Sequence, residues 1–371
     1  MFSYVVSVFV FATVASAIPQ FPQPGCRDIS IPITVSVPRF IVNATVNDNW
    51  DAIALTLALT RRDFSESTDP LPITGQTSEP VESTFKVGAT LCGKGGPTLV
   101  LTHGILESKL YWQPTPKGFE KYNFVKAAVA AGYSVLSYDR IGVGSSSKVD
   151  ALSDAQFQVE AAVLDSLVDY ARYATNATKV ALVGHSYGAY LTVASAASKK
   201  TAVDAIVLSG FAGGFSYFGP FLAGSGFRVA RLQNPLRWGA LDSGYLTSAD
   251  LFAETYAYFG EECDFERRVA EWSHYKSSEP FAVGELPSLI ASSPLNFAGV
   301  TAPVLAIQGQ FDLSACGGNC IGLLDGLKDD FAGAKVVKTV DNLPAGHNLN
   351  LHKVAPQAFE TIFSFLKSQG V

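Results

Sequence analysis

The sequence predicts an α/β protein with a doubly wound, mostly parallel sheet and an inserted, mainly helical cap. From about residue 98 onward, short apolar runs alternate with segments whose apolar residues recur every three or four positions. This pattern is typical of parallel strands that helices cover on both faces. Because βαβ connections are right-handed, each unit adds a strand parallel to the last. A packed core is expected, since 48% of the 371 residues are apolar or aromatic and 16% are charged.

The chain before residue 98 has a different pattern. Residues 31–37 and 53–60 alternate or are rich in β-forming residues, whereas residues 62–83 are rich in Pro, Ser, Thr and acids. We expect two or three antiparallel strands here, joined by a loop and extending one edge of the sheet.

After this segment, six buried strands are expected at residues 98–104, 133–140, 179–185, 204–210, 303–309 and 334–342. The helices that connect them are expected at residues 117–131, 153–174, 186–198, 321–331 and 354–367. The core therefore comprises residues 18–211 and 303–371.

The alternation of strands and helices stops after Gly210 and resumes at Pro303, so residues 212–302 are expected to form an inserted cap. This segment holds 16 of the 43 aromatic residues of the chain. Such an excess indicates an apolar wall over the core. The alternative is that Phe252, Tyr256, Phe259 and the other aromatic residues form only the small core of the cap itself.

Residues 1–17 form an uncharged hydrophobic stretch that ends in Ala15-Ser16-Ala17. This is typical of a secretory signal peptide, with a signal anchor as the alternative. No later run reaches the ~18 apolar residues that a transmembrane helix needs. The sequence predicts a secreted protein without a stable membrane span. With 27 basic and 33 acidic residues and no long basic run, it does not favour nucleic acid as a partner.

Secretion is consistent with two acceptor sequons, which predict glycosylation at Asn43 and Asn176. Five cysteines leave at least one thiol without an intramolecular partner. Cys316 and Cys320 are close enough in sequence for a small disulfide, and two buried free thiols are the alternative. No histidine lies near that pair at ligand spacing, so no metal site is expected.

The strongest chemical motif is Gly184-His185-Ser186-Tyr187-Gly188, placed directly after a predicted strand and directly before a helix. A serine that points out of such a turn has a strained backbone, so its flanking positions need residues without a Cβ. Gly184 and Gly188 meet this need. The sequence therefore predicts Ser186 as a nucleophile at the carboxyl edge of the sheet.

A serine nucleophile needs a base that accepts its proton. Of the five histidines, His347 follows the last predicted strand and so lies at the same sheet edge as Ser186. His352, at the start of the last helix, is the alternative, although a solvated or capping histidine is commoner there. His103 is expected to shape its loop.

The imidazole in turn needs a carboxylate that orients it. Asp312 follows the strand at residues 303–309 and is the best candidate. Asp139 also ends a strand, but its neighbours Arg140, Gly142 and Gly144 favour a structural ion pair and a turn. The amide of Tyr187, next to the nucleophile, and the amide of Ile105, after the strand at 98–104, are the expected oxyanion donors.

The order Ser186, Asp312, His347 resembles that of the α/β-hydrolase superfamily, specifically its capped serine hydrolases of the esterase, lipase and peptidase type. Matching motifs are His103-Gly104, residues 139–145, residues 184–188, Asp312 and Gly346-His347. The resemblance implies a serine nucleophile, no cofactor, and a cap between the sixth and seventh core strands. Serine at position 186 argues against the dehalogenase and epoxide-hydrolase branches, whose nucleophile is an aspartate.

Three functions follow as hypotheses. The first is a secreted hydrolase that opens an ester or lactone of an apolar or aromatic small molecule through an acyl-enzyme. The second is an amidase or aminopeptidase with the same triad, in which a cluster of acids in the cap binds an amine: Glu261, Glu262, Asp264 and Glu266. A solvated acidic surface is the alternative explanation of that cluster. The third is a non-catalytic binding protein on a hydrolase scaffold, and a lyase or cyclase is a lesser possibility. The sequence leaves the substrate and the oligomeric state open.

Overall fold

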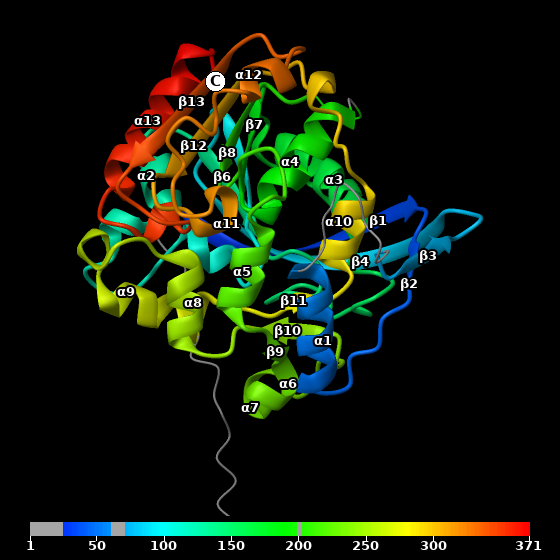
Figure 1. The fold of residues 1–371 in the computed structure, drawn as a ribbon. Helices are drawn as coiled ribbons and strands as arrows, with labels where there is room; N and C mark the ends of the chain where they lie inside the picture. The colour runs from blue at the N-terminus through cyan, green and yellow to red at the C-terminus, as the bar shows by residue number, and fades with distance from the viewer. Residues whose placement is uncertain (1–24, 61–70, 199, 201) are drawn as a thin grey trace, which may run out of the picture.

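The computed structural model describes residues 25–60, 71–198, 200 and 202–371. The predicted signal peptide at residues 1–17 lies outside this part of the chain. The central feature is an eight-stranded sheet with the order β1-β4-β6-β5-β7-β8-β12-β13, and helices flank it on both faces (Figure 1). Its strands are β1 (Cys26–Val37), β4 (Val81–Cys92), β5 (Thr98–Thr102), β6 (Ser134–Tyr138), β7 (Val180–His185), β8 (Ala205–Ser209), β12 (Val304–Gly309) and β13 (Val337–Leu343).

The predicted fold class is confirmed. The neighbouring strands from β6 to β13 are all parallel, whereas β4 pairs antiparallel with both β1 and β6. Every residue of β5, β6, β7, β8 and β12 is buried. This burial on both faces explains why these strands are continuous apolar runs in the sequence.

The antiparallel edge agrees with the prediction in part. In β1, buried Ile31, Ile33 and Val35 alternate with exposed residues, so one face of this strand is in contact with solvent. Residues 53–60, however, belong to a helix, α1 (Asn49–Thr60), and the expectation of a strand was wrong. The side chain of Asp48 accepts hydrogen bonds from the amides at the start of α1, and Ala and Leu within it favour a helix. Two short strands, β2 (Phe40–Val42) and β3 (Ile73–Gln76), form a separate pair.

The core helices are α2 (Phe124–Ala130), α3 (Phe157–Thr175), α4 (Tyr187–Ser198), α11 (Leu313–Cys316), α12 (Leu327–Asp330) and α13 (Ala355–Ser368). Helices α3 and α4 pack together against β5 and β7, whereas α2 and α13 pack together against β6 and β12 (Figure 1). Two predicted helices are shorter than expected. The helix at 117–131 begins only at Phe124, where Asn123 caps it, and that at 321–331 is reduced to α12.

Residues 212–302 leave the main sheet after β8 and rejoin it at β12; we call this segment the insertion. It contains α5 (Phe218–Ser225), β9 (Arg228–Val229), α6 (Ala230–Gln233), α7 (Pro235–Trp238), β10 (Tyr245–Thr247), α8 (Leu251–Tyr258), α9 (Arg267–Trp272), β11 (Phe281–Ala282) and α10 (Glu285–Ala291). Short helices predominate, but β9, β10 and β11 form a small antiparallel sheet that the sequence pattern did not reveal. No helix in the described ranges is long and apolar enough to cross a membrane.

Candidate active site

Ser186 occupies a sharp turn between the end of β7 and the start of α4. Its φ is 55°, in the left-handed region that residues with a side chain rarely adopt. A Cβ on Gly184 would lie 2.4 Å from the carbonyl oxygen of Gly188, and one on Gly188 would lie 2.3 Å from that of Thr102. Only glycine fits at both positions, so the flanking residues allow the strained turn that presents the Ser186 side chain.

Asp312 and His347 are joined by a hydrogen bond at the same sheet edge. The Asp312 side chain caps α11, with Oδ1 accepting from the amide of Ala315 at 2.8 Å. Its other oxygen, Oδ2, lies 2.8 Å from Nδ1 of His347, and both side chains are fully buried. Because a carboxylate only accepts, this contact assigns the proton to Nδ1 and leaves Nε2 of His347 able to accept one.

The surroundings of His347 favour its protonated form. Burial by itself would lower the pKa of this imidazole, but the Asp312 carboxylate outweighs that effect through its charge and its hydrogen bond. The charge of Glu107 acts in the same direction, and the pKa of His347 is raised above its ordinary value. Such a group is suited to take a proton from a nucleophile and hold it.

Ser186 and His347 both border the end of β8. The amide of Ser186 donates to the carbonyl oxygen of Ser209 at 2.8 Å. A Cβ on the next residue, Gly210, would lie 2.7 Å from Cε1 of His347. Within the described residues Nε2 of His347 has no hydrogen-bond partner, so the Ser186 hydroxyl is not bonded to it here. In free enzymes this bond is often long and shortens when substrate binds.

The two expected oxyanion donors lie on either side of this turn. Tyr187 begins α4, and Ile105 lies in the loop after β5, which approaches Ser186: a Cβ on Gly104 would lie 2.7 Å from Cβ of Ser186. Among the described groups, neither the Ile105 amide nor the Tyr187 amide donates a hydrogen bond. The hydroxyl of Tyr258 donates to the carbonyl oxygen of Ile105 at 2.6 Å, which fixes the orientation of that loop.

His352 is not the solvated or capping residue that its sequence position indicated. It is fully buried, and its Nε2 accepts from the amides of Gly260 and Gly346, both at 3.0 Å. Its Nδ1 donates to the carbonyl oxygen of Asn348 at 2.8 Å. Burial lowers its pKa to about 4, so it is neutral at physiological pH. His352 therefore holds the two residues that flank His347.

Asp139 does not form the ion pair expected of it. Its oxygens accept from the amide and hydroxyl of Ser145 and from the amide of Lys109. Arg140 instead pairs with Glu160 and Glu285, each at 2.8 Å, and all three side chains are buried. Burial, and the charge of Glu285, raise the pKa of Glu160 despite the attraction of Arg140.

Arg140 also contacts Tyr187 and the peptide group that links Gly104 to Ile105. It donates to the carbonyl oxygen of Gly104 at 3.3 Å, and its guanidinium lies 4.6 Å from the centre of the Tyr187 ring. His103 donates to the same carbonyl oxygen from Nδ1 and accepts the amide of Arg140 on Nε2, which agrees with a loop-shaping role. The sequence did not reveal the contacts of Arg140 with Glu160, Glu285 and Gly104, because these partners are distant in sequence.

Aromatic side chains of the insertion contact the His347 ring. The ring centre of Tyr258 lies 5.4 Å from that of His347, and the ring centre of Phe221 lies 6.4 Å from it. A cavity of about 320 Å³ lies between α4 and the insertion, lined by apolar residues that include Tyr190, Phe215 and Phe297. None of the predicted catalytic residues lines this cavity, so the aromatic surroundings of the site consist of the rings that contact His347.

The acidic cluster of the insertion is at the surface, with Glu261 and Glu262 exposed and Asp264 and Glu266 partly exposed. Glu262 pairs with Arg267, and Glu266 pairs with Lys121 and Arg268. Among the described residues, Glu261, Cys263 and Asp264 are the one group whose potential metal-ligand atoms all lie within 4.8 Å of one another. Exposed acidic groups of this kind are common without a metal.

Four of the cysteines form disulfides. Cys316 is bonded to Cys320 beside Asp312, and Cys26 is bonded to Cys92 across β1 and β4, a pairing that the sequence did not reveal. Cys263 is an exposed free thiol. Asn43 and Asn176, the two sequon asparagines, are exposed.

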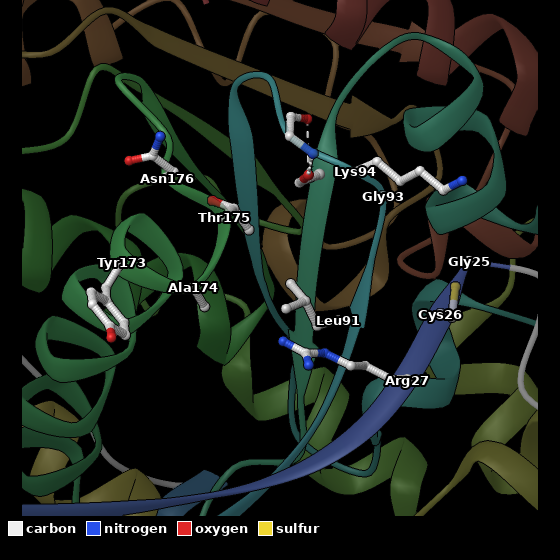
Figure 2. Close-up of a pocket in the computed structure, with 12 residues that line it drawn as sticks. Gly25, Cys26, Arg27, Leu91, Gly93, Lys94, Tyr173, Ala174, Thr175 and Asn176 are labelled. Atoms are coloured by element: carbon white, nitrogen blue, oxygen red, sulfur yellow. Dashed lines mark hydrogen bonds between the residues drawn. The ribbon is translucent and has the colours of Figure 1, made fainter.

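A further cavity, of about 480 Å³, lies at the opposite, amino edge of the parallel strands. Figure 2 shows it between the end of α3, with Tyr173 and Asn176, and the start of β1, with Arg27. Lys94, after β4, also lines it. None of the predicted catalytic residues lines this cavity.

Known sequences give a consistent assignment. The sequence model of the alpha/beta hydrolase family matches residues 99–359. A 1-acylglycerol-3-phosphate O-acyltransferase from Arabidopsis thaliana is 33% identical over 120 residues, which make up 32% of this chain and 26% of that protein. The chain thus spans about a quarter of the length of the curated relatives it matches.

Solved structures are similar in fold. A thermostable carboxyl esterase from Bacillus coagulans, crystallised with glycerol, is 15% identical with a TM-score of 0.56, covering 77% of this chain and 95% of that one. An esterase from Exiguobacterium antarcticum is 17% identical with a TM-score of 0.54, covering 76% of this chain and 96% of that one. At such identities the likeness concerns the fold alone.

Proposed function

The chain belongs to the alpha/beta hydrolase family, and on that basis we propose that it is a secreted serine hydrolase for a carboxylic ester or lactone of an apolar small molecule. One observation carries this proposal. The hydrogen-bonded Asp312–His347 pair, with a free Nε2, borders the same strand end as the strained turn of Ser186. A carboxylate, an imidazole and a hydroxyl in this order are the parts that acyl transfer requires, and Ser186 is partly exposed.

In the proposed reaction, Oγ of Ser186 attacks the substrate carbonyl while Nε2 of His347 takes its proton. The carboxylate of Asp312 stabilises the imidazolium, and the amides of Tyr187 and Ile105 donate to the oxyanion. The tetrahedral intermediate breaks its bond to the alkoxy oxygen, which leaves with the proton from His347. Water, activated by the same histidine, then hydrolyses the acyl-enzyme. With a lactone, the released hydroxyl stays on the acyl chain.

The apolar substrate class is supported by what surrounds the reacting groups. Phe221 and Tyr258, two aromatic residues of the insertion, contact the His347 ring. An amidase or aminopeptidase is less well supported, because the acids expected to bind an amine are on the surface, where Glu262 and Glu266 pair with basic residues. The acyltransferase relatives raise a further route, in which an alcohol replaces water as the acyl acceptor.

Secretion is part of the proposal. Two disulfides are typical of proteins that fold in an oxidising compartment, and the exposed Asn43 and Asn176 are accessible for glycosylation. Expression of the full chain in a secretory host should place it in the medium, and a glycosidase should lower its apparent mass. Retention inside the cell would contradict this part.

The activity is tested with p-nitrophenyl esters of graded chain length and the matched amides, using wild type and Ser186→Ala. We expect ester hydrolysis by wild type, a loss of about 10⁴-fold or more in Ser186→Ala, and a fluorophosphonate label on wild type alone. Product analysis with added glycerol separates hydrolysis from acyl transfer. A folded wild type that resists the label and cleaves no ester would support the binding-protein hypothesis instead.

A further inference from the structure

A second contact between a carboxylate and an imidazole lies beside the Asp312–His347 pair. Oε1 of Glu107 lies 3.3 Å from Nε2 of His185, the residue before the proposed nucleophile. The side chain of Glu107 is 4% exposed and that of His185 is fully buried. The proposed mechanism gives neither residue a role, although burying a carboxylate is costly unless its charge is compensated.

The hydrogen-bond partners of His185 determine where its proton lies. Within the described chain, Oε1 of Glu107 and Nε2 of His185 have no hydrogen-bond partner, so their contact at 3.3 Å is electrostatic and not a hydrogen bond. Nδ1 of His185 lies 3.0 Å from Oγ of Ser209, whose hydroxyl can donate to it. Two atoms without a proton at 3.3 Å would repel each other, so these contacts place the His185 proton on Nε2, beside the Glu107 carboxylate.

Glu107 also holds the loop that carries an expected oxyanion donor. Its Oε2 accepts from the amide of Gly104 at 2.7 Å, and Gly104 lies against Cβ of Ser186. Two residues later, Leu106 has a φ of 58°, so the loop turns sharply between Gly104 and Glu107. The carboxylate that closes this turn therefore determines where the amide of Ile105 lies.

His185 lies between the Glu107 loop and the proposed base. Its ring stacks on Tyr111 with centres 4.6 Å apart, and its centre lies 4.8 Å from that of His347. A Cβ on Gly210 would be in contact with both imidazole rings. The charge of the Glu107–His185 pair thus acts in the space where the oxyanion and the imidazolium form.

We propose that Glu107 and His185 are a positioning pair of this active site: Glu107 holds the Gly104–Leu106 loop against Ser186, and the His185 proton offsets its negative charge beside the developing oxyanion. The inference rests on the proposed function. Without that proton, a buried carboxylate would raise the energy of a nearby oxyanion, because electrostatic interactions are strong where water is excluded.

Three variants test the pair: Glu107→Gln, His185→Gln and the double variant. Glu107→Gln keeps an oxygen for the Gly104 amide and should lower kcat by about tenfold with little change in KM. His185→Gln leaves the carboxylate without its proton donor and should lower kcat by about 100-fold. The double variant removes the charge as well and should be about tenfold more active than His185→Gln. If the two residues had only a structural role, the double variant would have a kcat no higher than that of His185→Gln.

The matched control is Glu254→Gln in the insertion. Glu254 is also a buried carboxylate bonded to a histidine, His274, at 2.9 Å, and to two serine hydroxyls. This variant should lose stability while its kcat changes less than threefold.

A second readout is the acid limb of the pH profile, which Glu107→Gln should move to lower pH. The groups that face His347 are Asp312, Glu107, His185 and Tyr258, and Glu107 is one of the two carboxylates.

The outcomes separate the two proposals. If wild type takes no fluorophosphonate label and has no esterase activity, the proposed function fails. If wild type is active but folded His185→Gln keeps its kcat, or the double variant is no better than His185→Gln, the positioning pair is wrong and the hydrolase assignment stands. Thermal unfolding of each variant identifies any loss that is due to misfolding.

Discussion

The two edges of the main sheet differ in whether their polar side chains are buried or exposed to water. At the carboxyl edge Asp312, His347, His185 and Glu107 are buried, and Nε2 of His347 has no partner within the described chain. At the amino edge a cavity of about 480 Å³ is open, but Arg27, Lys94 and Tyr173, which line it, are exposed to water. A buried polar atom without a partner costs free energy, whereas an exposed charge costs little. We infer that a buried polar atom without a hydrogen-bond partner indicates the functional site of this protein better than the volume of a cavity does.

The largest effect should come from Asp312→Asn at the carboxyl edge. The amide can still accept from Ala315, but its NH₂ group would face Nδ1 of His347 and place the proton on Nε2. We expect kcat to fall by about 10⁴-fold with a small change in melting temperature. Steady-state kinetics on the best ester and thermal unfolding check this.

Asp139→Asn is the control, since Asp139 is also buried at a strand end but is bonded to Ser145 and Lys109. It should cost stability and less than tenfold in kcat. Equal losses in the two variants would mean that burial of a carboxylate, and not its contact with His347, explains the result.

His352→Phe should have the next largest effect. The phenyl ring fills similar space but leaves the amides of Gly260 and Gly346 without an acceptor, at about 1–3 kcal/mol each. Because Gly346 precedes His347, a shift of this loop should also lower kcat, by about 100-fold. Chemical denaturation and kinetics measure the two losses, and unchanged kcat in a destabilised variant would limit His352 to folding.

His347 and His352 show which parts of the site the sequence could predict and which it could not. The mostly parallel sheet, the Ser186 turn and the convergence of Asp312 with His347 follow from local patterns, because parallel strands end at one edge. His352 was misjudged because its partner Gly260 belongs to the insertion, which the sequence does not place. Glu107 was missed because it lies in the loop after β5, whereas its partner His185 ends β7, and the sequence pattern does not bring the two side chains together. Residues 53–60 were misjudged because alternating Ala and Leu suit both strand and helix.

The pH dependence of activity should follow His347. Its pKa is raised, so kcat/KM should rise with pH along a limb whose midpoint lies above about 6.5. For stability the sign is opposite: the folded state holds this proton more tightly, so its contribution is complete below the unfolded pKa and is lost as pH rises through the folded value. His352, with a lowered pKa of about 4, should instead cost stability as pH falls from about 6.5. A flat kcat/KM from pH 5 to 8 would contradict the role of His347.

The two disulfides offer a comparison of the two edges within one experiment. Replacing Cys26 and Cys92 by alanine opens a 66-residue separation and should cost about 4 kcal/mol of stability, without changing kcat of the folded protein. Replacing Cys316 and Cys320 should cost about 2 kcal/mol, because the loop is only four residues. This disulfide also holds the end of α11, where the backbone amide of Cys316 donates to the carbonyl oxygen of Asp312. Its loss should loosen the position of Asp312, so kcat should fall several-fold. The reverse pattern would contradict the assignment of function to the carboxyl edge.

The smallest effect on activity is expected from substitutions at the amino-edge cavity. Arg27→Ala and Lys94→Ala, singly or together, remove the positive charges that line the amino-edge cavity. Both side chains are exposed, so their loss leaves no buried group unpaired. Ligands of open α/β sheets bind at the carboxyl ends of the strands, and we therefore expect kcat/KM for the best ester to change less than twofold. A tenfold loss in the double variant, with unchanged melting temperature, would show that substrate is recognised at both edges and would break the contrast between them.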